Sequence, residues 1–190
     1  MSILNKAKPA LVLCAITTVI STVLIISSSF LPDTSNIIGE KLLNACKTLM
    51  GEGEYAIVDD WEAAGYDIAK PVSVNKLIRK QGSDIVAMEI SAAGFKPPDG
   101  ITALVAINPD GSVLGVVPVL IKDTVGYGDR THDADFLSGF IGKTSAVKIM
   151  KGVGDPAENE VMGITGATYS AQGVADAVNT ALAVYAEMKR

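Results

Sequence analysis

The longest hydrophobic run of the chain lies near its amino terminus, where residues 9–31 form 23 consecutive uncharged positions. As an α-helix with a rise of about 1.5 Å per residue, the run extends over roughly 34 Å, which is enough to cross a bilayer. A cleaved signal peptide is the main alternative, and residues 27–29 are small enough for a peptidase. However, the run is longer than the roughly 7–15 apolar residues of a signal peptide. The pattern therefore predicts an uncleaved transmembrane anchor, with a short cytoplasmic stub, over residues 1–31.

Beyond this anchor, the hydrophobic pattern alternates between helical and strand periods. Apolar residues recur at helical spacing from 38 to 49 and end at two glycines, which predicts a short amphipathic helix that packs on the following domain. Runs rich in strand-forming residues predict β-strands at 83–91, 101–108 and 112–121, with a further short strand at 147–150. Residues 61–71, between the helix and the first of these strands, are expected to be irregular.

The second and third predicted strands form a hairpin, because Asn-Pro-Asp-Gly at 108–111 has the composition of a tight turn. Pro118 indicates an edge position or the end of a strand. A glycine-rich polar loop follows at 123–135, and the chain ends in a helix that begins at about Ser170. An antiparallel core with helices before and after it predicts an α+β fold. The apolar positions of the final helix recur every three or four residues: Val174, Val178, Leu182 and Tyr185.

Charge supports an extracytoplasmic location for residues 32–190. Lys6 and Lys8 precede the hydrophobic run and no acidic residue does, so the positive-inside bias places the amino terminus in the cytoplasm. These two lysines are the only charged residues up to position 32. The remaining 14 basic and 21 acidic residues give the chain beyond residue 32 a net charge of −7. A domain this acidic repels a phosphate backbone, so nucleic acid is excluded as a partner.

Most metal chemistry is excluded by the scarcity of its ligands. Cys14 lies in the predicted anchor and Cys46 beyond it, and without a Cys-x-x-Cys pair the chain has no signature of an iron–sulfur cluster, a c-type haem or a zinc ribbon. The chain has one histidine, His132. Three aspartates surround it and are interpreted as a solvated loop, with a hard-cation site as the alternative: Asp129, Asp133 and Asp135.

The stretch Gly-Ile-Thr-Gly-Ala-Thr-Tyr-Ser at 163–170 stands directly before the final helix. The amino terminus of a helix presents unpaired N–H groups and the positive end of its dipole, which together stabilise an anion such as phosphate. Gly163 and Gly166 permit a close backbone approach that a side chain would block. An ordinary glycine turn with a Thr or Ser cap is the alternative interpretation of the same residues.

Thr165-Gly166-Ala167-Thr168 resembles the Ser/Thr-Gly-Ala-Thr motif of a family of FMN-binding domains, and specifically the G subunit of the Rnf electron-transport complex and the C subunit of the sodium-pumping quinone reductase. In those proteins the last Thr carries FMN through a phosphoester bond, so the resemblance implies covalent FMN on Thr168. Four further stretches are similar to the family and extend the resemblance over most of the chain: 94–101, 108–113, 123–128 and 136–143.

The resemblance also implies a set of cofactor-binding residues in two segments. Thr124, Gly126 and Gly128 are implied to line the isoalloxazine ring. Three positions depart from the family pattern: Asp123 replaces a Glu, Val125 replaces a Pro, and Met162 replaces an Asp that is thought to help the modifying transferase recognise its target. With Thr168, the full implied set is Asp123, Thr124, Gly126, Tyr127, Gly128, Thr165, Gly166, Ala167 and Ser170.

The chemistry of the motif indicates that another protein attaches the flavin. A Thr hydroxyl is a poor nucleophile, and the motif holds no basic residue to activate it, so a flavin transferase is expected as a maturation partner. Outside the cytoplasm, a flavin that dissociates would not be replaced. A covalent tether prevents this loss and keeps the cofactor at an effective concentration of about a millimolar or more.

The family resemblance implies an electron-carrier subunit of a membrane-bound, ion-translocating oxidoreductase of the Rnf type. Its implied partners are the other membrane subunits and the iron–sulfur or flavin subunits of the same complex. We expect no turnover by the isolated subunit, because the flavin supplies the redox chemistry and the chain shows no acid–base pocket. Two alternatives remain open from the sequence: a membrane-anchored sensory or regulatory flavin domain, and a cofactor-free extracytoplasmic scaffold.

Overall fold

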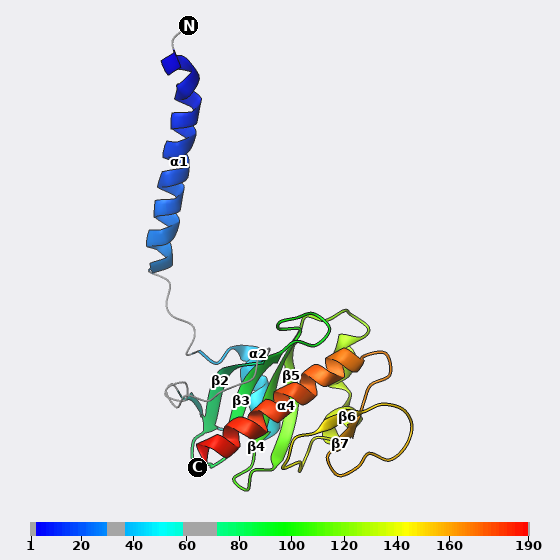
Figure 1. Cartoon of the computed structure of the whole chain (residues 1–190). Helices are drawn as coiled ribbons and strands as arrows, with labels where there is room; N and C mark the ends of the chain where they lie inside the picture. The colour runs from blue at the N-terminus through cyan, green and yellow to red at the C-terminus, as the bar shows by residue number, and fades with distance from the viewer. Residues whose placement is uncertain (1–2, 30–36, 59–71, 190) are drawn as a thin grey trace. The chain divides into compact units, whose positions relative to one another are not determined.

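A computed structural model describes residues 3–29, 37–58 and 72–189, which fall into two compact units, Met1–Asn36 and Ile37–Arg190 (Figure 1). The first unit contains the helix α1, Ile3–Ser29. Within the described part of the chain, no helix meets the length and hydropathy required of a membrane span. The transmembrane anchor over 1–31 thus stays a prediction from the sequence.

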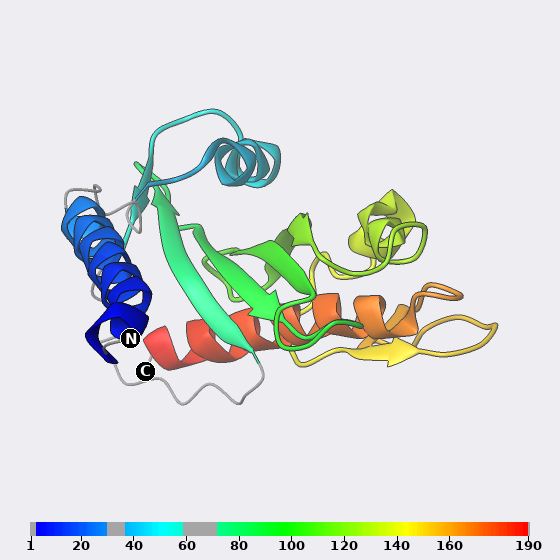
Figure 2. The ribbon, with the colours of Figure 1, turned by 90° about the horizontal axis from the view of Figure 1, so that it is seen from above.

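The second unit is built on a five-stranded antiparallel sheet with the order β1-β2-β3-β4-β5. Helix α2, Glu40–Met50, covers one face of this sheet, and α4, Thr168–Met188, covers the other (Figure 2). The five strands follow one another in space as in sequence, and their bounds are Tyr55–Ile57, Ser73–Lys80, Val86–Ala92, Ile101–Ile107 and Val113–Ile121.

The connection between β5 and α4 carries four short elements. A 3-10 helix, η2 (Gly128–His132), leads into the single-turn helix α3 (Ala134–Ser138). Strand β6, Lys148–Met150, then pairs in parallel with β7, Glu160–Met162. Five residues, 163–167, connect β7 to α4.

Burial on both faces explains the composition of the central strands. Every residue of β4 is buried, because its side chains alternate between the α4 side and the α2 side of the sheet. On the α4 side, Val105 and Ile107 belong to the same hydrophobic cluster as Val174 and Val178. On the α2 side, Leu104 packs in a second cluster with residues of α2 and of the neighbouring strands. Continuous apolar runs are typical of strands that are covered on both faces.

The predicted α+β plan with an antiparallel sheet and flanking helices is confirmed. At the predicted hairpin turn, the Gly111 amide donates to the Asn108 carbonyl at 2.9 Å, and the Asn108 amide donates to the Ser112 carbonyl at 2.8 Å. Pro118 lies in β5, which is an edge strand as predicted. Helix α4 begins two residues earlier than predicted, at Thr168. Residues 61–71, which we expected to be irregular, lie outside the described residues.

Cys46 in α2 and Glu89 in β3 are two titratable residues whose pKa values are raised by burial. The Cys46 thiol is fully buried, and desolvation together with the negative charge of Glu89 raises its pKa to about 11. Desolvation raises the pKa of Glu89 as well, against a smaller opposing effect of Lys76, which stands opposite it in β2. The thiol is therefore protonated and unreactive at neutral pH.

Substitution of Glu89 by glutamine is expected to stabilise the domain at neutral pH. Since the pKa of Glu89 is raised in the folded state, its contribution to stability is present below its ordinary pKa of 4.5 and is lost as the pH rises through the raised value. Thermal unfolding of the wild type and Glu89→Gln should give similar midpoints near pH 4 and a higher midpoint for the variant at pH 7. A variant that is less stable at pH 7 would contradict this account.

Candidate functional site

The Thr-Gly-Ala-Thr motif leads directly into α4, and its last residue, Thr168, is the first residue of the helix. Ala167 occupies the N-cap position and its side chain makes no capping hydrogen bond, so the alternative of a Thr or Ser cap is wrong here. The first backbone hydrogen bond of the helix runs from the Ala171 amide to the Ala167 carbonyl at 2.9 Å. The amides of residues 168–170 therefore precede the helical ladder, as an anion site at a helix terminus requires. Thr168 itself is exposed.

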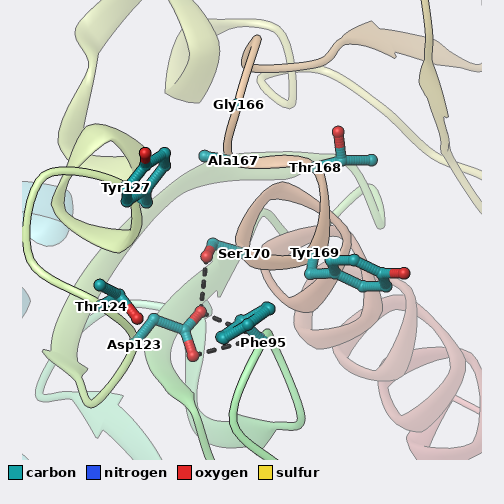
Figure 3. A pocket seen from close by; sticks show the side chains of 9 residues that line it. All are labelled: Phe95, Asp123, Thr124, Tyr127, Gly166, Ala167, Thr168, Tyr169 and Ser170. Atoms are coloured by element: carbon teal, nitrogen blue, oxygen red, sulfur yellow. Dashed lines mark hydrogen bonds between the residues drawn. The ribbon is translucent and has the colours of Figure 1, made fainter.

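A cavity of about 400 Å³ lies beside this turn (Figure 3). Its volume falls within the range of about 300–1,000 Å³ that is usual for small-molecule sites. Three segments that are distant in sequence form its wall: the loop after β3, the loop after β5 and the start of α4. The nine lining residues are Phe95, Asp123, Thr124, Tyr127, Gly166, Ala167, Thr168, Tyr169 and Ser170.

Aromatic side chains form much of the cavity's rim. Phe95, Tyr127 and Tyr169 are 58%, 55% and 67% exposed, which is unusual for side chains of this size. The rings of Phe95 and Tyr169 lie with their centroids 6.0 Å apart and their planes tilted by 58°. A flat, apolar ring system placed between these side chains would bury the aromatic surface that each of them leaves in water.

Asp123 is the centre of a hydrogen-bond cluster at the base of the cavity, where it is only 7% exposed. Oδ1 accepts from the Phe95 amide at 3.1 Å and from the Lys96 amide at 2.9 Å. Oδ2 accepts from the Phe95 amide at 3.0 Å and from the Ser170 hydroxyl at 2.5 Å. One carboxylate thus joins all three segments that form the wall of the cavity.

Three residues of the predicted site do not line this cavity. A Cβ atom at Gly128 would lie 2.6 Å from the Cβ of Asp123, so Gly128 lets the loop pack against that residue. Gly126 has a φ of +85°, and its amide donates to Asp129 Oδ1 at 2.6 Å, which shapes the turn between Thr124 and η2. Thr165 lines a neighbouring cavity, and its carbonyl accepts a hydrogen bond from the Arg130 guanidinium.

Two residues that line the cavity are missing from the predicted set, Phe95 and Tyr169. Phe95 lies in one of the stretches that resemble the family. It is 70 positions before the motif in the chain, so the sequence alone did not indicate that the two are in contact. Tyr169 directly follows the motif, between two residues that we did assign, Thr168 and Ser170. An aromatic side chain at the start of an amphipathic helix, on the polar face, is the signal that could have identified it.

Two of the three aspartates around His132 have structural roles, Asp129 and Asp133. Asp133 caps α3, since its Oδ1 accepts from the Asp135 amide at 2.9 Å and from the Phe136 amide at 3.4 Å. Asp129 shapes the preceding turn through the Gly126 amide. Within residues 3–29, 37–58 and 72–189, no group of three or more His, Cys, Asp or Glu side chains is placed to hold a metal ion.

Part of the chain that surrounds the cavity is similar to a known sequence family. The family model of the FMN-binding domain matches residues 98–183, a segment that contains every lining residue except Phe95. FMN is therefore the cofactor that the sequence of this segment supports.

Among solved structures, the chain is similar to the crystal structure of NqrC from Shewanella oneidensis. The two are 23% identical in sequence, the match covers 66% of this chain and 68% of that one, and the TM-score is 0.50. This likeness shows a shared fold. No curated protein sequence matches the chain.

The residues around the cavity fit the shape and charge of FMN. The exposed Thr168 hydroxyl stands at the positive end of α4, where a phosphate would sit, and the aromatic rim lies beside it, where a flat ring would pack. Gly166 has a φ of +82°, in the left-handed region that favours glycine, so the turn into α4 depends on this residue for its conformation.

Proposed function

We propose that this protein is an electron carrier in which FMN is attached to Thr168 through a phosphoester bond. The observation that carries the proposal is the position of the Thr168 hydroxyl, which is exposed at the first turn of α4 and lines an aromatic-rimmed cavity inside the segment that matches the FMN-binding domain. When bound, FMN would supply the redox chemistry, and the chain would supply attachment, orientation and electrostatics.

The chain's own residues divide this work between two ends of the cavity. At the phosphate end, Thr168 Oγ1 would form the ester, and the amides of residues 168–170 with the positive end of α4 would stabilise the remaining negative charge. At the ring end, Phe95, Tyr127 and Tyr169 would pack against the isoalloxazine and keep water from it. Thr124 contributes a hydroxyl to the same wall (Figure 3).

Attachment would require a flavin transferase. A Thr nucleophile needs a general base, and the motif around Thr168 holds no basic side chain. The phosphoester is therefore a modification made by another enzyme. Met162, in β7, stands where the family commonly has an Asp, and it is 37% exposed, so it is accessible to such an enzyme.

The wider setting that we propose is a single-pass membrane subunit of an Rnf-type, ion-translocating oxidoreductase. Residues 1–31 would form the anchor, with the amino terminus in the cytoplasm and residues 32–190 outside. The support is the uncharged run at 9–31 and the exposed apolar side chains along α1, among them Val19 and Leu24. Electrons would pass between this flavin and the iron–sulfur or flavin centres of partner subunits.

An absorption spectrum of the purified full-length protein tests this function. Protein co-produced with a flavin transferase should be yellow and should show the two visible bands of oxidised flavin after extensive dialysis. Protein made without the transferase is the matched control and should be colourless after the same treatment. A colourless preparation from both cultures would reject the flavin carrier and leave a cofactor-free scaffold as the better description.

A further inference from the structure

The Asp123 carboxylate combines burial with a complete set of hydrogen bonds from neutral donors. Three donors reach its two oxygens: the Phe95 amide, which is shared between both oxygens, the Lys96 amide and the Ser170 hydroxyl (Figure 3). Each oxygen thus already accepts two contacts from the protein itself, out of the about four acceptor positions that a carboxylate offers. Although Asp123 lines the cavity, it is therefore poorly suited to bind a ligand directly.

None of these donors neutralises the charge of Asp123. Within the described residues, no Lys, Arg or His side chain forms an ion pair with it. Lys96 contributes only its backbone amide, and Lys122, the preceding residue in the chain, pairs with Asp99 instead. The nearest cation of the following loop, Arg130, binds the Thr165 carbonyl. A negative charge thus stays at the wall of a cavity that is otherwise mostly apolar.

Close packing also fixes the position of this charge. A Cβ atom at Gly94, Gly100 or Gly128 would lie 2.7, 2.5 or 2.6 Å from an atom of Asp123. The backbone of two segments, the loop between β3 and β4 and the start of η2, therefore packs closely around the side chain. The hydrogen bond to Ser170 ties it to the first turn of α4, two residues from Thr168. The charge cannot rotate away when the electrical environment of the cavity changes.

We propose that Asp123 is a positioning residue that lowers the reduction potential of the FMN carried by Thr168, through its fixed charge and without binding the flavin. This inference rests on the function proposed above. Reduction by two electrons with uptake of one proton leaves the flavin with one more negative charge than before. A like charge at the wall of a partly water-excluded cavity opposes that change. The flavin is thereby kept at a lower potential than the same cavity without the charge would give.

Two substitutions with opposite expected signs test this inference. Asp123→Asn removes the charge at nearly constant size, and we expect the equilibrium constant for two-electron reduction to rise at least tenfold, which corresponds to about 30 mV. Ser170→Ala removes a hydroxyl that partly offsets the charge and leaves the carboxylate, so we expect the potential to fall. Both potentials are measured by spectroelectrochemical titration of the flavin-loaded full chain.

A purely structural role of Asp123 would lower the midpoint of thermal unfolding in both variants without moving the potentials in opposite directions. Equal potentials in all three proteins, or shifts of the same sign, would overturn the inference. If Asp123→Asn fails to fold, Ser170→Ala decides alone, and an unchanged or raised potential would reject the proposal. Intact-mass measurement of each preparation separates the two claims: a flavin-loaded chain with unshifted potentials rejects only the role of Asp123, whereas a wild type without flavin rejects both.

Discussion

Thr168→Ala, co-produced with a flavin transferase, is expected to lose all covalently bound flavin. The physical reason is that the phosphoester needs a hydroxyl oxygen at this position, and alanine removes that oxygen with little effect on the start of α4, since the side chain is exposed and makes no capping bond. Ultraviolet fluorescence of a denaturing gel measures the result, because only covalently bound flavin stays with the denatured chain.

Thr165→Ala is the matched control for this experiment. Thr165 carries the same hydroxyl three residues earlier and is also exposed, but it lines the neighbouring cavity. It should keep the fluorescence of the wild type. Thr168→Ser, which restores the hydroxyl, should recover part of the signal. Equal fluorescence in Thr168→Ala and the wild type would place the attachment at another residue.

Gly100→Ala is expected to have the largest effect on stability. An added Cβ would lie 2.3 Å from the Ala93 carbonyl oxygen, 2.5 Å from Asp123 Oδ1 and 2.8 Å from the Lys96 carbonyl oxygen. Two of these three atoms belong to the backbone, so the clash cannot be relieved by a side-chain rotation. We expect the free energy of unfolding to fall by about 3 kcal/mol, the upper end of the usual cost of overpacking. Urea denaturation of the flavin-free protein measures this loss.

Gly82→Ala is the control that measures the cost of replacing a glycine where the added Cβ causes no clash. Gly82 has a φ of +72°, and an added Cβ there would meet nothing within 4 Å. The cost should be about 1 kcal/mol, the usual penalty for an L-residue in the left-handed region. A similar loss in the two variants would mean that the loop around Asp123 tolerates a side chain and is less closely packed than the structure indicates.

Sequence periodicity predicted the elements whose pattern is local and uninterrupted. The hairpin of β4 and β5 followed from two apolar runs and a Pro-Asp-Gly turn, and α4 followed from a clean helical repeat. Strand β2 was missed, because the register shifts between Val74 and Lys76 and the inward positions therefore do not alternate regularly. Strands β1 and β7 are three residues long each, which is too short for any period to appear.

In the candidate site, too, the residues of a contiguous motif were predicted, whereas contacts between distant segments were not. The motif at 165–168 predicted an attachment residue from the sequence alone, because its residues are contiguous and precede a helix. Asp123 was in the predicted set, but its hydrogen-bond cluster could not be predicted, since its partners lie 27, 28 and 47 positions away in the chain. Phe95 was missed for the same reason, as only the folded sheet brings the loop after β3 next to the start of α4.

The central claim, a flavin ester on Thr168, is tested most directly by intact-mass spectrometry followed by peptide mapping of the transferase-treated protein. The account predicts a mass above that of the unmodified chain by FMN less one water, with the whole increment on the peptide that contains Thr168. An unmodified mass after treatment with a transferase that modifies another substrate, or an increment mapped to a different peptide, would contradict it.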